Sequence, residues 1–120
     1  MIELEDAVME IIVNAGQSRS LCFEALHAAR TGNIDEARLL LNEADGYARR
    51  AHQMQTQLIE QDAGEARQPM TLIMVHAQDH LMNSLLAREF SEELISLYRR
   101  CILKNNISEN ISLRRARMGW

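Results

Sequence analysis

The chain has 120 residues, enough for one domain around one hydrophobic core. The sequence is rich in the helix formers Leu, Ala, Glu, Arg and Met, and it contains only five Gly, one Pro and 4% aromatic residues. This composition favours helices over strands and predicts an all-α fold. From residue 99 onward there are six Lys and Arg side chains and one Glu; this segment therefore carries +5 and residues 1–98 carry −9, which gives the net charge of −4. So few basic residues, without interleaved aromatic ones, exclude a nucleic-acid binder.

The cysteine content and the hydropathy exclude two further classes of protein. Cys22 and Cys101 lie in apolar helical patterns and do not make the framework of a small secreted domain. No apolar run approaches the roughly 20 residues that span a bilayer, and no signal peptide opens the chain. We therefore expect a cytoplasmic protein with reduced thiols.

Helical periodicity predicts a first helix over residues 3–31. Gly16 lowers its helix propensity and predicts a bend or a close contact with another helix. Gly32 suits the left-handed position after this helix, and Asn33 is expected to cap the next one together with Glu36. A tight reversal of the chain should follow.

The second helix is predicted over residues 34–62, with a buried stripe of small and aliphatic side chains (Ala37, Leu40, Leu41, Ala44, Ala48, Ala51, Met54, Gln55 and Leu58). Residues 62–69 should form the connection, with Pro69 in the first turn of the third helix. That helix should continue through Ile102. Beyond Lys104, Asn and Ser residues favour a flexible basic tail over residues 105–120, which leaves residues 1–104 as the domain.

The third helix is apolar around more than half of its circumference. An antiparallel three-helix bundle buries only one stripe of each helix, so this surplus apolar surface favours self-association. Closed cyclic symmetry is the usual solution for such an assembly.

A polar face interrupts this apolar helix. His76, Asp79 and His80 share it with Asn83, while Met74, Val75, Leu81, Met82, Leu85 and Leu86 are expected on the opposite side. Paired histidines one turn apart can bind a metal together with Asp79, but Ala77 stands where zinc hydrolases place their general base. His76 could instead be a nucleophile that accepts a phosphoryl group, or the two histidines could be hydrogen-bonded packing residues.

Three motifs, in order and at suitable spacing, resemble the lactose/cellobiose-type enzyme IIA of the bacterial phosphoenolpyruvate-dependent sugar phosphotransferase system. They are Ile12-Val-Asn-Ala-Gly-Gln-Ser-Arg-Ser-Leu21, Ala51-His-Gln-Met-Gln-Thr-Gln-Leu-Ile59 with the following Ala63-Gly64, and Val75-His-Ala-Gln-Asp-His-Leu-Met82. Together they cover about residues 5–103. The sequence after residue 105 does not resemble the usual C-terminus of this family.

The resemblance implies that His76 is the catalytic residue, which accepts phosphate on Nε2 from phospho-HPr and passes it to a cysteine of enzyme IIB. It also implies a homotrimer with a nine-helix core, in which Asp79 of each subunit meets at the axis around Mg²⁺ or another divalent cation. Oxygen ligands suit such an ion.

The substrate class implied by the resemblance is a lactose-, cellobiose- or chitobiose-type sugar, with the membrane reached only through enzyme IIC. His80, Gln78 and Gln57 are candidates to orient the imidazole of His76. The alternative is a helical metal-binding or scaffold module in which His76, Asp79 and His80 hold one ion within a subunit.

Overall fold

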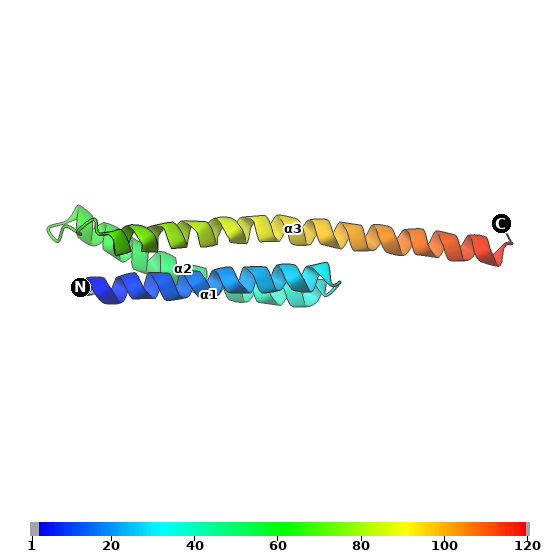
Figure 1. Ribbon diagram of the computed structural model, residues 1–120, viewed down its shortest axis with the longest axis horizontal. Coiled ribbons are helices and arrows are strands. Elements are labelled where there is room, and N and C mark those ends of the chain that lie inside the picture. The colour runs from blue at the N-terminus through cyan, green and yellow to red at the C-terminus, as the bar shows by residue number, and fades with distance from the viewer. Residues whose placement is uncertain (1–2, 120) are drawn as a thin grey trace.

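The computed structural model describes residues 3–119, which form three helices and no strand. They are α1 (Leu4–Arg30), α2 (Ile34–Ala63) and α3 (Leu72–Arg117). The chain runs up, down and up, so α2 is antiparallel to both of its neighbours and α1 and α3 run in the same direction (Figure 1). The predicted all-α, antiparallel three-helix fold is confirmed.

The turn between α1 and α2 ends the first helix by its backbone geometry. Gly32 has a φ of 94°, where residues other than Gly are strained. Its N–H donates to the carbonyl of Ala29 at 3.1 Å, and the N–H of Asn33 donates to the carbonyl of Ala28 at 2.8 Å. These two bonds make a Schellman motif, as Gly32 predicts. The predicted side-chain cap is wrong, because Asn33 makes no capping hydrogen bond to α2.

Helix α3 begins later than the sequence predicts, because the connection from α2 extends past Pro69. Asp62 Oδ1 accepts a hydrogen bond from the N–H of Gln68 at 2.7 Å, which holds the connection against the end of α2. Thr71 then caps α3, since its Oγ1 accepts from the N–H of Met74 at 3.3 Å. Pro69 therefore precedes the helix and is not in its first turn, because the side-chain cap of Thr71 sets the start.

Small residues bring α1 and α2 close together. Ala37, Ala44, Ala48 and Ala51 of α2 are all buried, as predicted. The hydroxyl of Ser18 on α1 donates to the carbonyl of Ala44 at 2.9 Å, a contact that only closely packed backbones permit. The core continues as two clusters, one around Ile11, Leu58 and Leu81 and the other around Cys22, Leu41 and Ile95.

An arginine joins α3 to α2 in the middle of the bundle. Arg88 Nε lies 2.6 Å from Asp45 Oδ1, and its Nη2 lies 3.0 Å from Asp45 Oδ2. A bidentate pair of this kind is stronger than a single contact. The hydrogen bonds that Arg88 donates to Asp45 raise the pKa of Arg88 above its ordinary value. Arg88 also pairs with Glu92 one turn along its own helix.

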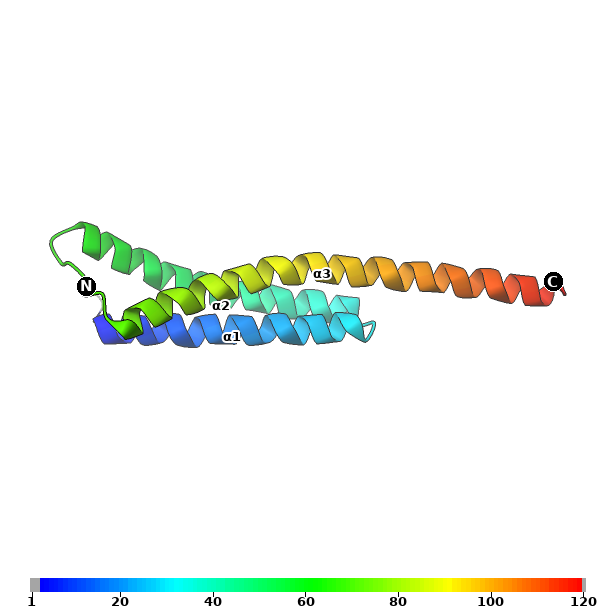
Figure 2. The same ribbon diagram turned by 45° about the horizontal axis from the view of Figure 1, so that its top comes forward.

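Helix α3 is much longer than the other two and projects beyond the turn between α1 and α2 (Figure 2). The predicted end of the helix near Lys104 is therefore wrong. Asn and Ser cost only a few tenths of a kcal/mol each relative to better helix formers, and residues 105–117 contain no Gly or Pro to stop propagation. Mobility of this segment in solution stays a prediction, and Trp120 lies outside the described residues.

None of the helices in residues 3–119 combines the length and the apolar character that crossing a membrane requires.

Candidate functional site

The predicted site lies on the first turns of α3. His76 and Asp79 are exposed, His80 is half-buried, and Met74, Ala77 and Leu81 of the same turns are buried against α1 and α2. Buried residues three and four apart fix the rotation of the helix, so His76 is held on the outside by packing and not by its own contacts. A regular, well-packed helix therefore presents this imidazole to solvent.

The two histidines lie against each other. The ring centroids of His76 and His80 are 5.6 Å apart and the ring planes are inclined by 19°, which is a stacked arrangement. Helix α1 backs this pair through Gly16: a Cβ at that position would lie 3.5 Å from His80 Nε2. That distance is an ordinary van der Waals contact with a side chain, so the close helix contact predicted from Gly16 stays a prediction. His80 thus stands between His76 and the backbone of α1.

The other two candidates to orient His76 are placed elsewhere. Gln78 Oε1 accepts a hydrogen bond from Gln55 Nε2 of α2 at 2.5 Å, and its own Nε2 lies 3.7 Å from the sulfur of Met74. Its amide is therefore used to join α2 and α3. Gln57 is exposed on α2. Of the three candidates, His80 is the one in contact with His76.

The alternative metal site within one subunit does not form. No group of three or more His, Cys, Asp or Glu side chains in residues 3–119 is placed to hold a metal ion. His76 and His80 are stacked and do not converge on a point. Asp79 is the acceptor of a hydrogen bond from Asn83 Nδ2 at 3.3 Å. A single chain thus supplies one exposed carboxylate at this place.

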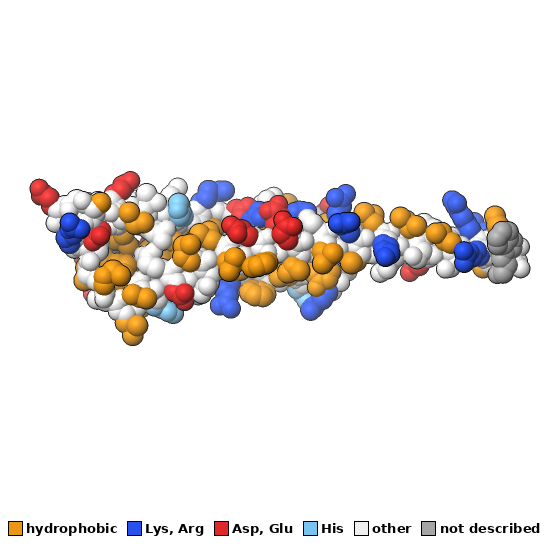
Figure 3. All heavy atoms as spheres, turned by 90° about the horizontal axis from the view of Figure 1, so that it is seen from above, with side chains coloured by type: hydrophobic (Ala, Val, Ile, Leu, Met, Phe, Trp, Pro, Cys, Tyr) orange, Lys and Arg blue, Asp and Glu red, His pale blue; other side chains and the backbone are white. Residues whose placement is uncertain are grey.

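Asp79 lies within a line of exposed apolar side chains, which we call the α3 stripe: Val75, Met82, Leu86, Phe90 and Leu97. The sequence predicted Val75, Met82 and Leu86 on the side opposite to Asp79, together with the buried Met74 and Leu81. That prediction is wrong for these three residues, because they stand four residues before, three after and seven after Asp79, spacings that place side chains on the same face of a helix. Apolar side chains are exposed along much of the length of the molecule (Figure 3).

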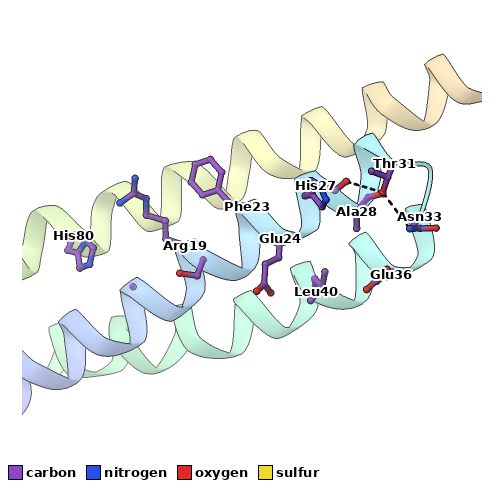
Figure 4. A pocket seen from close by; sticks show the side chains of 12 residues that line it. Arg19, Phe23, Glu24, His27, Ala28, Thr31, Asn33, Glu36, Leu40 and His80 are labelled. Atoms are coloured by element: carbon purple, nitrogen blue, oxygen red, sulfur yellow. Dashed lines mark hydrogen bonds between the residues drawn. The ribbon is translucent and has the colours of Figure 1, made fainter.

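An open groove of about 1060 Å³ begins at His80 and follows α1 to its C-terminal turn (Figure 4). Arg19, Phe23 and His27 of α1 line one side of it, and Glu36 of α2 lies near its far end. The guanidinium of Arg19 lies 5.7 Å from the centre of the Phe23 ring. Sequence analysis missed this groove, although Gly16, Arg19, Phe23 and His27 follow one another at helical spacing on one face of α1.

The fold and the site define a class of protein: a helical subunit that presents one of two stacked imidazoles from the first turns of its third helix, with no metal cluster in residues 3–119. Comparison with known proteins narrows this class. The profile of the family described as "PTS system, Lactose/Cellobiose specific IIA subunit" matches residues 6–99. The chain belongs to this family, and it is a phosphotransferase component of that sugar system.

Known relatives support this assignment over most of the chain. The chain is 48% identical over 96 residues to the N,N'-diacetylchitobiose-specific EIIA component of Escherichia coli K12, an alignment that covers 80% of this chain and 83% of the relative. The crystal structure of the cellobiose-specific enzyme IIA of Bacillus anthracis superposes with a TM-score of 0.82 at 34% identity, covering 87% of this chain and 96% of the other. The IIA(Chitobiose) of Escherichia coli, solved in solution in complex with HPr, gives 0.73 at 44% identity, covering 84% and 98%.

Proposed function

We propose that His76 is the phosphoryl acceptor of this IIA subunit, taking the phosphoryl group from phospho-HPr and passing it to a cysteine of enzyme IIB. The single observation that carries this proposal is the exposure of His76 on a helix whose rotation is fixed by its buried side. A carrier must be reached by two different proteins in turn. A fixed, protruding imidazole meets that need, and the complex of the chitobiose IIA relative with HPr supports the choice of donor.

The two phosphoryl transfers require mainly that the chain holds the imidazole of His76 in position. In the first step, the lone pair of His76 Nε2 attacks phosphorus in line, and the P–N bond of the donor phosphohistidine breaks with its electron pair returning to the donor ring. In the second, a thiolate of the acceptor attacks phosphorus, the P–N bond at His76 breaks, and the released imidazole nitrogen is again free. Such transfers depend mainly on positioning and charge stabilisation.

His80 is the positioning residue in this proposal. Its ring covers one face of His76 at 5.6 Å and rests on Gly16 of α1, which limits the orientations open to His76. The groove along α1 begins at His80, the residue that is stacked on His76. Restricting the ring before the partner arrives lowers the entropy cost of reaching the reactive geometry.

We also propose that the functional unit is a homotrimer with a nine-helix core, formed along the α3 stripe. The exposed fractions of Met82, Leu86 and Phe90 lie between 51% and 59% in the single chain, a surplus that a monomer rarely leaves in contact with water. Three copies related by cyclic symmetry would bring their stripes together at one axis. The position of Asp79 within the stripe supports its presence near that axis.

Asp79 fits a shared divalent cation such as Mg²⁺. It is a carboxylate among apolar side chains, with one hydrogen bond from Asn83, and one chain alone offers too few ligands. Three converging carboxylates would repel one another unless protons or a cation neutralise them, and hard oxygen donors suit Mg²⁺. The ion would supply charge neutralisation for assembly, away from the transfer at His76.

The sugar imported by the complete system is proposed to be of the cellobiose or chitobiose type, which the specificities of the similar proteins support. The IIA subunit itself handles only the phosphoryl group. It would act in the cytoplasm and reach the membrane through enzyme IIC.

The test is transfer from phosphoenolpyruvate through enzyme I and HPr. We expect acid-labile phosphate on the wild type and none on His76→Ala, while His52→Ala, which changes an exposed histidine on α2, is labelled normally. His80→Gln should still accept phosphate but more slowly, with the loss in the rate of transfer and not in HPr affinity. Undiminished labelling of His76→Ala would reject the proposal.

A further inference from the structure

The part of α3 that projects beyond the bundle, residues 103–117, has an uneven distribution of side chains that the phosphoryl-carrier function does not use. We call it the basic extension. Every residue in it is exposed, and it spans about 22 Å at the helical rise of 1.5 Å per residue. It lies outside residues 6–99, the range that the family profile matches. Neither α1 nor α2 covers it (Figures 1 and 2).

Three of its aliphatic side chains and all four of its basic ones share one half of the helix. Leu103, Ile107 and Ile111 follow at i, i+4 and i+8 and form a narrow apolar line, with more than 45% of each residue exposed. At about 100° per residue, the four cations of the extension all lie within about 80° of Ile107 around the helix axis. They are Lys104, Arg114, Arg115 and Arg117.

The opposite half carries neutral polar side chains, Leu113, Ala116 and the single acidic residue. Glu109 is about 160° from Ile107 around the axis, on the side of Asn105 and Ser112. The far end of the molecule therefore displays a cluster of basic side chains (Figure 3). A helix with cations flanking an aliphatic line is built to lie on a surface that is both apolar and negatively charged.

The apolar line of Leu103, Ile107 and Ile111 is poorly suited to packing against a second copy of the chain. An α-helix completes about five turns in 18 residues, so the positions that follow Leu86, Phe90 and Leu97 in the α3 stripe are Lys104, Ser108 and Arg115, while Ile111 stays in line with Val75. The interface proposed for the trimer thus becomes mixed in the basic extension, with two cations and a serine beside Ile111. Parallel copies would also bring their arginine clusters together, and like charges repel.

We propose that the basic extension binds an anionic phospholipid surface, with Ile107 and Ile111 inserted among the acyl chains and the arginines on the headgroups. Charge complementarity selects this occupant, since residues 1–98 carry −9 and only this end of the molecule is attracted to such a surface. A lone convex helix has no concave pocket for a protein partner. The proposal is independent of phosphoryl transfer at His76.

The test is co-sedimentation of the full chain with vesicles of phosphatidylcholine alone and with vesicles that also contain phosphatidylglycerol. We expect binding to the second kind only, falling as salt is raised. Replacing Arg114, Arg115 and Arg117 together with Ser should weaken partitioning roughly 100-fold, at the usual contribution of each cation near an anionic surface. The transfer of phosphate from HPr should be unchanged in that variant.

Two further variants separate the apolar contribution from the charge. Ile107→Asn with Ile111→Asn should weaken binding at constant charge. Leu113→Asn is the matched control, because Leu113 is exposed but lies about 120° from Ile107 around the helix, and it should bind like the wild type. Circular dichroism checks that each variant keeps its helix; if the isoleucine variant loses it, the arginine variant decides. Equal binding to both vesicle types, or no binding to either, would overturn the proposal.

Discussion

The replacement Leu86→Glu tests the proposed trimer at the centre of the α3 stripe. Leu86 is 51% exposed in the single chain. Complete burial of a leucine is worth about 1.5–3 kcal/mol, so burying its exposed half contributes about 1 kcal/mol per subunit and about 3 kcal/mol per trimer. A glutamate at this place must in addition be desolvated beside two copies of itself, which costs several kcal/mol per carboxylate. The total exceeds what a few aliphatic contacts can offset.

We therefore expect the wild type to sediment as a trimer and Leu86→Glu as a folded monomer at the same concentration. Leu39→Glu is the control: Leu39 is exposed on α2, about 200° around that helix from the buried Ala37, and so points away from the bundle. It should leave the trimer intact. A wild type that sediments as a monomer, a trimer that survives Leu86→Glu, or dissociation caused equally by Leu39→Glu would refute the reasoning.

Three other changes give distinct outcomes. Asp79→Leu should retain the trimer and raise its melting temperature, because converging charges are replaced by apolar groups; a monomer in sedimentation would count against an axial position. Arg88→Met should lower the free energy of unfolding by about 1–3 kcal/mol in urea titrations, since it leaves the partly buried Asp45 carboxylate without its bidentate partner, and an unchanged midpoint would show that the pair is not stabilising. Burial raises the pKa of the Cys22 thiol. The unfolded chain therefore loses this proton first as the pH rises, so part of the stability should be lost at alkaline pH, and Cys22→Ala should reduce that loss. In the native protein, a disulfide reagent should react with the exposed Cys101 well before Cys22, whereas equally fast reaction of both thiols would contradict this burial.

Sequence periodicity was sufficient for the number and order of the three helices and for the buried alanines of α2, because alanines at helical spacing have only one way to pack closely against a neighbour. It did not give the end of α3, and Leu40, Met54 and Gln55 of the predicted stripe are only half-buried. It was also sufficient for Gly32, whose positive φ is the ordinary solution at the end of a helix. The position of Pro69 was predicted wrongly, because the capping bond of Thr71 competes with the preference of proline for the first turn. Two local preferences of similar strength, here a side-chain cap and a first-turn proline, cannot be ranked from the sequence without the tertiary contacts.

The candidate site, like the fold, was predicted from the sequence only in part. The pattern placed His76, Asp79 and His80 on one side of α3, but it could not show that the two imidazoles stack or that Gln78 is held by Gln55 of α2. These are contacts between side chains or between helices, which spacing along one helix does not determine. The grouping of Val75 with Met74 failed for a different reason, since Val75 stands four residues before Asp79 and helical spacing alone places the two on one face.

The most direct test of the whole account is to identify which imidazole carries phosphate in the working protein. The ¹⁵N-histidine spectrum of the wild type, recorded before and after addition of phosphoenolpyruvate, enzyme I and HPr, resolves each histidine ring and each ring nitrogen. The account predicts that Nε2 of His76 alone gains a phosphoryl group and that the group is lost again when enzyme IIB is added. Phosphate on His80 or another residue, or a spectrum unchanged by HPr, would contradict it.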